Sequence, residues 1–250
     1  MHESNILQLL YEFEHFRILS HNPTGNGVGL WPNEMKCLLW SALNAPQANW
    51  VEIGSWNGGS TVLLCLARQF LNYGPKIFTV DINYDGYFDE NISNGGFWKF
   101  IRKINGSSKT FHECYPQDKI SFAFIDGFHS FNWIMRDFNN IKDHLIDKAI
   151  LVFHDCSPAI YTPNNSLYIK SCQEKVNKNL SRYMNSKTQD FLVDEAIAYI
   201  LQNKRFKPLE IPVRQYEFYP ERTRLNKWIR GTTSPYNAIM AIQYDATSTS

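Results

Sequence analysis

The sequence predicts a doubly wound α/β fold with a mostly parallel sheet, N-terminal helices and a C-terminal elaboration. From Trp50 onward, short apolar runs rich in Val, Ile and Phe alternate with helical segments. Strands of this kind, each followed by a helix, are typical of parallel sheets that are buried on both faces and joined by right-handed crossovers. The chain has 250 residues, of which 44% are hydrophobic, so it can bury one substantial core.

The hydrophobic periodicity places each expected element along the chain. Residues 1–48 form a helical segment, with helices expected at 5–17 and 33–43 and a loop at 21–30 between them. In the core, residues 49–155, strands are expected at 50–53, 77–80, 122–125 and 149–153, a weaker one at 110–112, and helices at 60–72, 95–105 and 131–146. In residues 156–250, helices are expected at 169–184 and 189–203, and the last strands at 209–213 and 238–244. Because no repeat or linker divides the chain, we expect residues 1–250 to form a single domain.

The composition argues against several classes of protein. A formal charge of +1 gives no overall attraction to nucleic acid or to a membrane, and no run approaches the roughly 18 apolar residues of a membrane span. The first 18 residues carry three glutamates and lack the pattern of a secretion signal, so we expect a cytoplasmic protein. The five cysteines are scattered without a C-x-x-C pair, which argues against a zinc cluster and a disulfide framework.

A glycine-rich turn follows the first expected strand and precedes a helix. It reads VEIGSWNGGST over residues 51–61. Glycines let the backbone turn sharply and approach a ligand closely, and the free amides at a helix start favour a polar or anionic group. Gly54 and Gly58 have G-x-x-x-G spacing, which differs from the G-x-G-x-x-G spacing of dinucleotide sites, and no Gly-Lys-Ser/Thr of a phosphate loop follows.

An acidic residue, Asp81, ends the expected strand at 77–80. A carboxylate at the tip of the second strand is able to accept hydrogen bonds from both ribose hydroxyls of an adenosyl ligand. The alternative is that Asp81 has only a structural role, in a turn or as a helix cap. The glycine turn before it favours the ribose contact.

Ionisable residues follow two further strands. Asp126 and His129 come after the strand at 122–125, and His154 and Asp155 come after the strand at 149–153. Since parallel strands present their carboxyl ends at one edge of the sheet, we expect these four side chains to meet. Asp126, His154 and Asp155 are candidate ligands of one divalent cation, which would lower the pKa of a substrate hydroxyl. His129, with an ordinary pKa of about 6.5, is the alternative base, and the expected catalytic residues are Asp126, His129 and His154.

The motifs VEIGSWNGGST, TVD, FIDGFHS and VFHD together resemble those of the class I S-adenosylmethionine-dependent methyltransferases. Within that class they are similar to the branch with a D-G-x-H motif after strand four, which includes macrocin-type sugar O-methyltransferases and cephalosporin-hydroxylase-like proteins. The resemblance covers about residues 33–155 and implies a Rossmann-like fold. It makes residues 49–155 a cofactor-binding core and residues 156–250 an elaboration on the substrate side.

The resemblance also implies roles for individual residues. S-adenosylmethionine would be the cofactor, with Asp81 on its ribose and Asp126 also in contact with it. The residues expected around its methionine end are Glu52, Gly54, Ser55, Gly58, Gly59, Ser60 and Thr61. Adenine contacts are expected from around Tyr84, Glu113 or Asp118. Where the resembled enzymes have an acidic or amide pair after strand five, this chain has His154 and Asp155, which leaves open whether magnesium, a softer metal or no metal is used.

The expected activity is O-methylation of a hydroxylated small molecule, such as a sugar or a glycosylated metabolite. Basic and aromatic residues interleave at 202–230, which suits an anionic acceptor or, as we slightly prefer, an ordinary solvated face. A nucleic-acid partner is disfavoured because the Asn/Asp-Pro-Pro-Tyr/Phe motif of amino-methylating enzymes is missing, and a homo-oligomer is left open. The alternatives are a nicotinamide-dependent oxidoreductase on a similar sheet and a non-catalytic protein that binds an adenosyl ligand.

Overall fold

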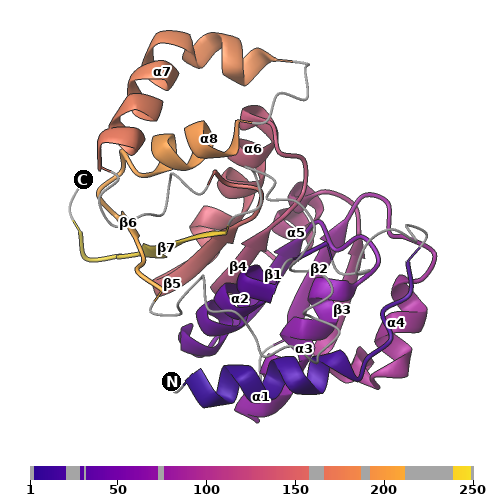
Figure 1. Ribbon diagram of the computed structural model, residues 1–250. Coiled ribbons are helices and arrows are strands. Elements are labelled where there is room, and N and C mark those ends of the chain that lie inside the picture. The colour runs from indigo at the N-terminus through magenta and orange to yellow at the C-terminus, as the bar shows by residue number, and fades with distance from the viewer. Residues whose placement is uncertain are drawn as a thin grey trace.

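A seven-stranded, mostly parallel sheet forms the centre of the computed structural model, which describes residues 3–20, 29–30, 32–72, 76–157, 166–186, 192–211 and 239–248. The strand order is β3-β2-β1-β4-β5-β7-β6 (Figure 1). The parallel strands are β1 (Asn49–Ile53), β2 (Ile77–Asp81), β3 (Ile101–Asn105), β4 (Ile120–Ile125) and β5 (Leu145–Phe153). Strand β7 (Met240–Tyr244) is antiparallel to β5 and to β6 (Phe206–Pro208). The predicted doubly wound fold is confirmed.

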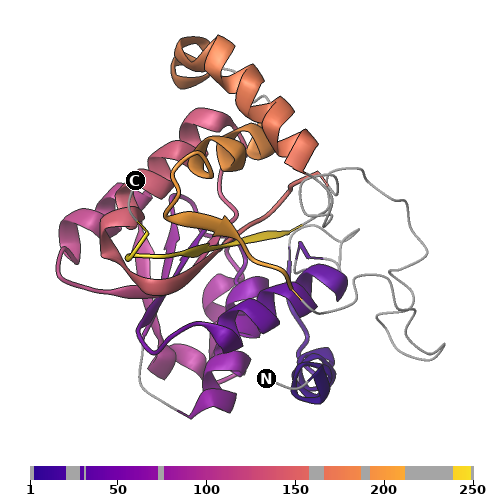
Figure 2. The ribbon, with the colours of Figure 1, turned by 90° about the vertical axis from the view of Figure 1, so that its left-hand side faces the viewer.

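Helices cover both faces of the sheet, as Figure 2 shows with the sheet between two layers. One face packs against α1 (Glu3–Glu14), α2 (Pro32–Asn44), α3 (Gly59–Leu71), α4 (Phe88–Asn94) and the 3-10 turn η1 (Phe97–Phe100). The other packs against α5 (Ser108–Cys114), α6 (Phe131–Ile141), η2 (Lys142–His144), α7 (Ser166–Asn185) and α8 (Val193–Ile200). Side chains alternate between the two layers along each strand, because successive residues of a strand point to opposite faces. On β1, Trp50 belongs to the first layer and Val51 to the second.

Two predicted elements are wrong in the region between β2 and β4. The helix predicted at 95–105 is instead η1 followed by β3, and the strand predicted at 110–112 lies within α5. Strand β3 is an edge strand in which only Ile101 and Ile104 are buried, so it lacks the continuous apolar run of a central strand. Gly96, at φ +65°, separates α4 from η1 and prevents one continuous helix.

The C-terminal part differs in detail from the prediction. Helices α7 and α8 and strand β7 are present near their expected positions. The strand expected at 209–213 is not found at 209–211; the structure instead has β6 just before them, and residues 212–213 lie outside the described residues. Most of the basic and aromatic segment 202–230 also lies outside them. Within the part of the chain that the structure describes, no helix has the length and apolar character needed to cross a bilayer.

The register of the parallel strands aligns their carboxyl ends. Ile53 pairs with Val80 on one side and with Ile125 on the other, and Ile125 pairs with Phe153. The residues that follow these positions stand in a row at one edge of the sheet: Asp81, Gly54, Asp126 and His154. Open α/β sheets bind ligands at this edge, so the fold brings the glycine turn and the ionisable residues to the same place.

Candidate active site

The glycine turn after β1 is held against the end of β4. Gly54 has φ +90°, a left-handed conformation that side chains rarely adopt, and its N–H donates to the carbonyl of Val80 at 2.9 Å. A Cβ at Gly54 would lie 2.1 Å from the carbonyl oxygen of Asp126. Glycine is therefore required here on two counts, by its dihedral angle and by this close approach.

The turn leads directly into α3 through a second left-handed glycine. Gly58 has φ +83° and its N–H donates to the carbonyl of Ser55 at 2.7 Å. The side-chain oxygen of Asn57 accepts from the N–H of Gly59 at 3.1 Å, which satisfies one of the free amides of the first helical turn. The other amides at this helix start belong to Ser60 and Thr61.

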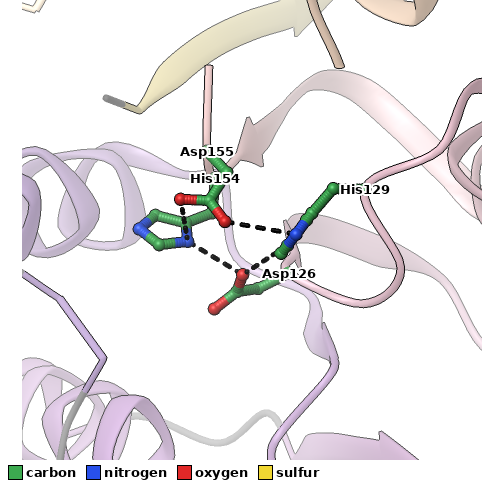
Figure 3. Close-up of side chains that lie close together, drawn as sticks. All are labelled: Asp126, His129, His154 and Asp155. Atoms are coloured by element: carbon green, nitrogen blue, oxygen red, sulfur yellow. Dashed lines mark hydrogen bonds and ion pairs between the residues drawn. The ribbon is translucent and has the colours of Figure 1, made fainter. Parts of the chain in front are cut away.

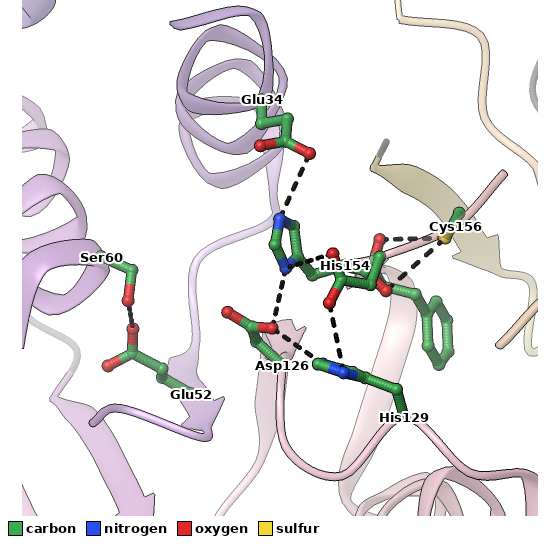
Figure 4. A network of polar contacts seen from close by, with 9 residues as sticks. Glu34, Glu52, Ser60, Asp126, His129, His154 and Cys156 are labelled. Atoms are coloured by element: carbon green, nitrogen blue, oxygen red, sulfur yellow. Dashed lines mark hydrogen bonds and ion pairs between the residues drawn. The ribbon is translucent and has the colours of Figure 1, made fainter. Parts of the chain in front are cut away.

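Glu52 is fully buried beneath this turn. Its carboxylate accepts a hydrogen bond from the hydroxyl of Ser60 at 2.6 Å (Figure 4). It accepts a second from the hydroxyl of Thr61 at 2.5 Å. Burial raises the pKa of Glu52 to about 7, against the opposing effect of these hydrogen bonds. The buried Glu52 side chain thus connects the end of β1 to the start of α3 through these two hydrogen bonds.

Asp81 lies at the tip of β2, beside the glycine turn. Its two carboxylate oxygens accept hydrogen bonds from the backbone N–H groups of Trp56 and Asn83, each at 2.8 Å. A carboxylate offers about four lone-pair sites, so these two bonds leave acceptor capacity on each oxygen. The geometry therefore suits the predicted contact with a pair of ribose hydroxyls.

The three residues considered for adenine contacts lie in different places. The Tyr84 hydroxyl donates to the carbonyl of Thr79 at 2.5 Å, and its ring packs against Phe88 and the Lys103 ammonium. Asp118 accepts from the side chain of Asn49, the first residue of β1, and is therefore at the opposite edge of the sheet. Glu113 is exposed near the end of α5 and pairs with Lys109 at 3.2 Å.

The four ionisable residues predicted to meet do lie together, and we refer to Asp126, His129, His154 and Asp155 as the ionisable cluster (Figure 3). One ligand atom from each lies within 4.8 Å of those of the others. His154 Nδ1 lies 2.9 Å from Asp126 Oδ1, and His129 lies 3.3 Å from Asp126 through Nε2 and 3.2 Å from Asp155 through Nδ1. Two imidazoles and two carboxylates in this arrangement are a donor set that fits a divalent transition metal.

The segment that begins α8 fixes both loops of the cluster. The N–H of Leu192 donates to the carbonyl of His129 at 3.1 Å. The side chain of Asp194 accepts from the N–H of Ser157 at 2.9 Å and from the hydroxyl of Tyr168 at 2.7 Å. The C-terminal elaboration thus contributes to the position of His129 and of the turn that carries Asp155.

Sequence reasoning missed one residue, Glu34 on α2. Its Oε1 lies 3.2 Å from His154 Nε2, on the side of the ring that faces away from the cluster (Figure 4). Both side chains are buried, Glu34 at 4% and His154 at 7% exposure. A glutamate in the first turn of an amphipathic helix carries no signal that it contacts a residue 120 positions later, so only the tertiary structure reveals this pair.

Neighbouring charges decide the protonation of the cluster. Burial by itself would raise the pKa of Asp126, but the charge of His154 and hydrogen bonds from both histidines lower it below its ordinary value. Burial likewise opposes the charged form of His154, yet Asp126 and Glu34 raise its pKa well above the ordinary value. The pKa of Asp155 is raised because burial outweighs the attraction of His154 and His129.

Residues 51–156 match the family model of a methyltransferase domain. No curated protein matches the sequence.

Solved structures of methyltransferases share this fold over most of the chain. The O-methyltransferase from Bacillus cereus in complex with SAH is 14% identical, with a TM-score of 0.55 over 98% of this chain and 92% of that one. The O-methyltransferase TomG from Streptomyces achromogenes, involved in tomaymycin synthesis and solved with SAM, is 13% identical, with a TM-score of 0.54 over 98% and 91%. An rRNA methylase from Streptococcus thermophilus is 12% identical, with a TM-score of 0.51 over 84% and 94%.

At these identities the likeness is one of fold, and it includes enzymes with different acceptors. The fold and the matched residues nevertheless agree with each other, because residues 51–156 contain most of β1, all of β2 to β5 and every motif on which the resemblance was based. Residues 51–156 therefore match a methyltransferase domain, and the described part of the chain has a Rossmann-like fold of the class I methyltransferase type.

Proposed function

We propose that the chain is an S-adenosylmethionine-dependent O-methyltransferase that acts on a hydroxyl group of a small molecule. One observation supports this most strongly: the glycine turn and the ionisable cluster lie against each other at the carboxyl edge of the sheet. The Asp126 N–H donates to the carbonyl of Ile53 at 2.8 Å, and its carbonyl lies against Gly54. A cofactor on the turn would therefore present its methyl group close to the cluster.

S-adenosylmethionine supplies a methyl group that is already activated on a sulfonium sulfur. The protein then has two tasks, to align the acceptor oxygen with that methyl group and to remove one proton. The glycine turn, Asp81 and Asp126 perform the first task on the cofactor side. The structures solved with SAM or SAH support this cofactor, because their fold matches this chain.

His129 is the group we propose as the proton acceptor. At 26% side-chain exposure it is the most accessible member of the cluster, and the Asp155 carboxylate beside Nδ1 orients its ring. As the acceptor oxygen bonds to the methyl carbon, the carbon–sulfur bond breaks with its electrons to sulfur, and the hydroxyl proton passes to His129. Removing this proton by a positioned histidine contributes typically 10²–10⁴-fold in rate.

Asp126, His154 and Asp155 are the residues we propose as ligands of a divalent cation. Such a cation would bind the acceptor hydroxyl and lower its pKa. The mixed nitrogen and oxygen donors favour a first-row transition ion such as Mn²⁺, Fe²⁺ or Co²⁺ over Mg²⁺, which prefers oxygen ligands. His154 reaches the cluster through Nδ1, whose distances to the two carboxylates are 2.9 Å and 3.6 Å.

Transfer assays with isotopically labelled S-adenosylmethionine would test this function. The acceptor panel would include sugars, glycosylated phenols and simple phenols, each with and without EDTA. We expect a methyl ether on a hydroxylated acceptor, and loss of turnover on chelation if the cation is required. Methyl transfer to nitrogen or to RNA alone would contradict the proposed acceptor class, and turnover that survives chelation would remove the cation from the proposal.

A further inference from the structure

We infer that Glu34 is a positioning residue of the ionisable cluster, whose carboxylate fixes the ring of His154 so that Nδ1 faces a bound transition-metal ion. The inference rests on the proposed cation site and adds a residue outside the matched methyltransferase domain. Glu34 lies on α2, which precedes β1 in the chain. The role thus belongs to the N-terminal helical segment.

The two nitrogens of His154 have different surroundings. Nε2 lies 3.2 Å from Glu34 Oε1, whereas Nδ1 lies 2.9 Å from Asp126 Oδ1 and 3.6 Å from Asp155 Oδ1 (Figure 4). In the structure Nδ1 shares a hydrogen bond with Asp126 Oδ1, so a cation bound at Nδ1 would take the place of the proton there. Glu34 Oε1 lies at ion-pair distance from Nε2, and its negative charge favours a proton on Nε2, which leaves Nδ1 for the cation.

Glu34 is suited to this task because it is buried and lies in the first turn of a helix. Carboxylates are seldom buried to 4% exposure unless they are paired. Glu34 is in the first turn of α2, where the partial positive charge of the helix start stabilises an anion. Its negative charge also increases the electron density that His154 can donate, which raises the basicity of Nδ1 toward a cation.

Cobalt and manganese titrations of the whole chain would test the inference. Co²⁺ is the first probe because its visible absorption reports nitrogen coordination, and calorimetry with Mn²⁺ gives an affinity. Compared with wild type, we expect Glu34→Gln to bind both ions roughly 10–100-fold more weakly and to show an altered Co²⁺ spectrum. Adenosylhomocysteine affinity should be unchanged, which shows that the variant is folded and that its cofactor site is intact.

Glu195→Gln is the matched control, since Glu195 is another largely covered carboxylate, 12% exposed, that pairs with Lys175 on α7. This variant should bind metal as wild type does. Glu34→Asp keeps the charge and should recover part of the affinity, which a purely structural role for Glu34 does not predict. It also provides a second test if Glu34→Gln does not fold.

The two proposals fail in different ways. If wild type binds Co²⁺ and Glu34→Gln binds it equally well with the same spectrum, Glu34 is not a positioning residue, and the cation site stands. If wild type binds neither ion, the cation site itself is wrong, and the role of Glu34 is overturned with it. If both Glu34→Gln and Glu195→Gln lose affinity equally, the effect is general and the inference is wrong.

Discussion

The backbone of Gly54 lies so close to Asp126 that a Cβ at position 54 would meet the Asp126 carbonyl oxygen at 2.1 Å. This contact joins the turn expected to bind the cofactor to the first residue of the ionisable cluster. Gly54 also has φ +90°, so a side chain here would be strained even with more space. The two halves of the candidate site thus depend on one glycine.

Gly54→Ala should therefore disturb both halves at once. Because the nearest atoms are backbone, the clash cannot be relieved by rotating a side chain, and we expect destabilisation of about 3 kcal/mol or more from strain and overpacking. Urea unfolding would measure the loss of stability. Gly96→Ala is the control, since Gly96 is also left-handed, at φ +65°, but a Cβ there meets nothing within 4 Å. Equal losses in the two variants would show that backbone strain alone explains the effect.

His129→Ala should lower methyl transfer by about 10²–10⁴-fold and leave adenosylhomocysteine affinity near that of wild type. The reason is that His129 contacts the two aspartates of the cluster and is not among the residues expected to hold the cofactor. Single-turnover rates would measure the effect. A variant that transfers methyl groups at the wild-type rate would exclude His129 as the base.

Glu52 should make stability depend on pH. Its pKa is about 7 in the folded chain and 4.5 as the ordinary value, so the folded state holds the extra proton between these limits. The free energy of unfolding should then fall as the pH rises from about 4.5 to about 7, by roughly 3 kcal/mol, and this contribution should be constant above pH 7. Glu52→Gln, whose amide oxygen accepts from one of the two hydroxyls while its NH₂ donates to the other, should flatten this dependence in urea unfolding.

Asp137 provides the comparison for Glu52. It is buried, accepts from Ser108 at 2.6 Å, and has a pKa raised to about 6 by burial. Asp137→Asn should therefore flatten the pH dependence only from about 4 to about 6, whereas Glu52→Gln should act up to about 7. Parallel pH profiles for wild type and both variants would contradict the assignment of raised pKa values to these two carboxyls.

Much of this fold could be predicted from the sequence because central strands carry a strong signal. Buried on both faces, β1, β2, β4 and β5 read as short apolar runs, and each is followed by a turn or helix. Strand β3 was not predicted because it is an edge strand in which Ile101 and Ile104 alone are buried. Local sequence could not separate it from a helix.

The composition of the cluster was also predictable, since its four members follow the ends of two parallel strands. Topology alone brings such residues to one edge. Glu34 was not predictable in this way, because its partner His154 is reached only through the packing of α2 beside the sheet. The sequence therefore predicts which residues meet at the ends of strands. It does not predict which residues on distant helices contact them.

Calorimetric titration of adenosylhomocysteine into wild type and Asp81→Ala tests the central claim most directly. The glycine turn and Asp81 together form the proposed site, so wild type should bind with low-micromolar or better affinity. Loss of the Asp81 carboxylate should weaken binding by about 1–3 kcal/mol, or roughly 5–150-fold, through lost ribose hydrogen bonds. A folded wild-type chain that does not bind adenosylhomocysteine, or that binds NAD in its place, would contradict the account.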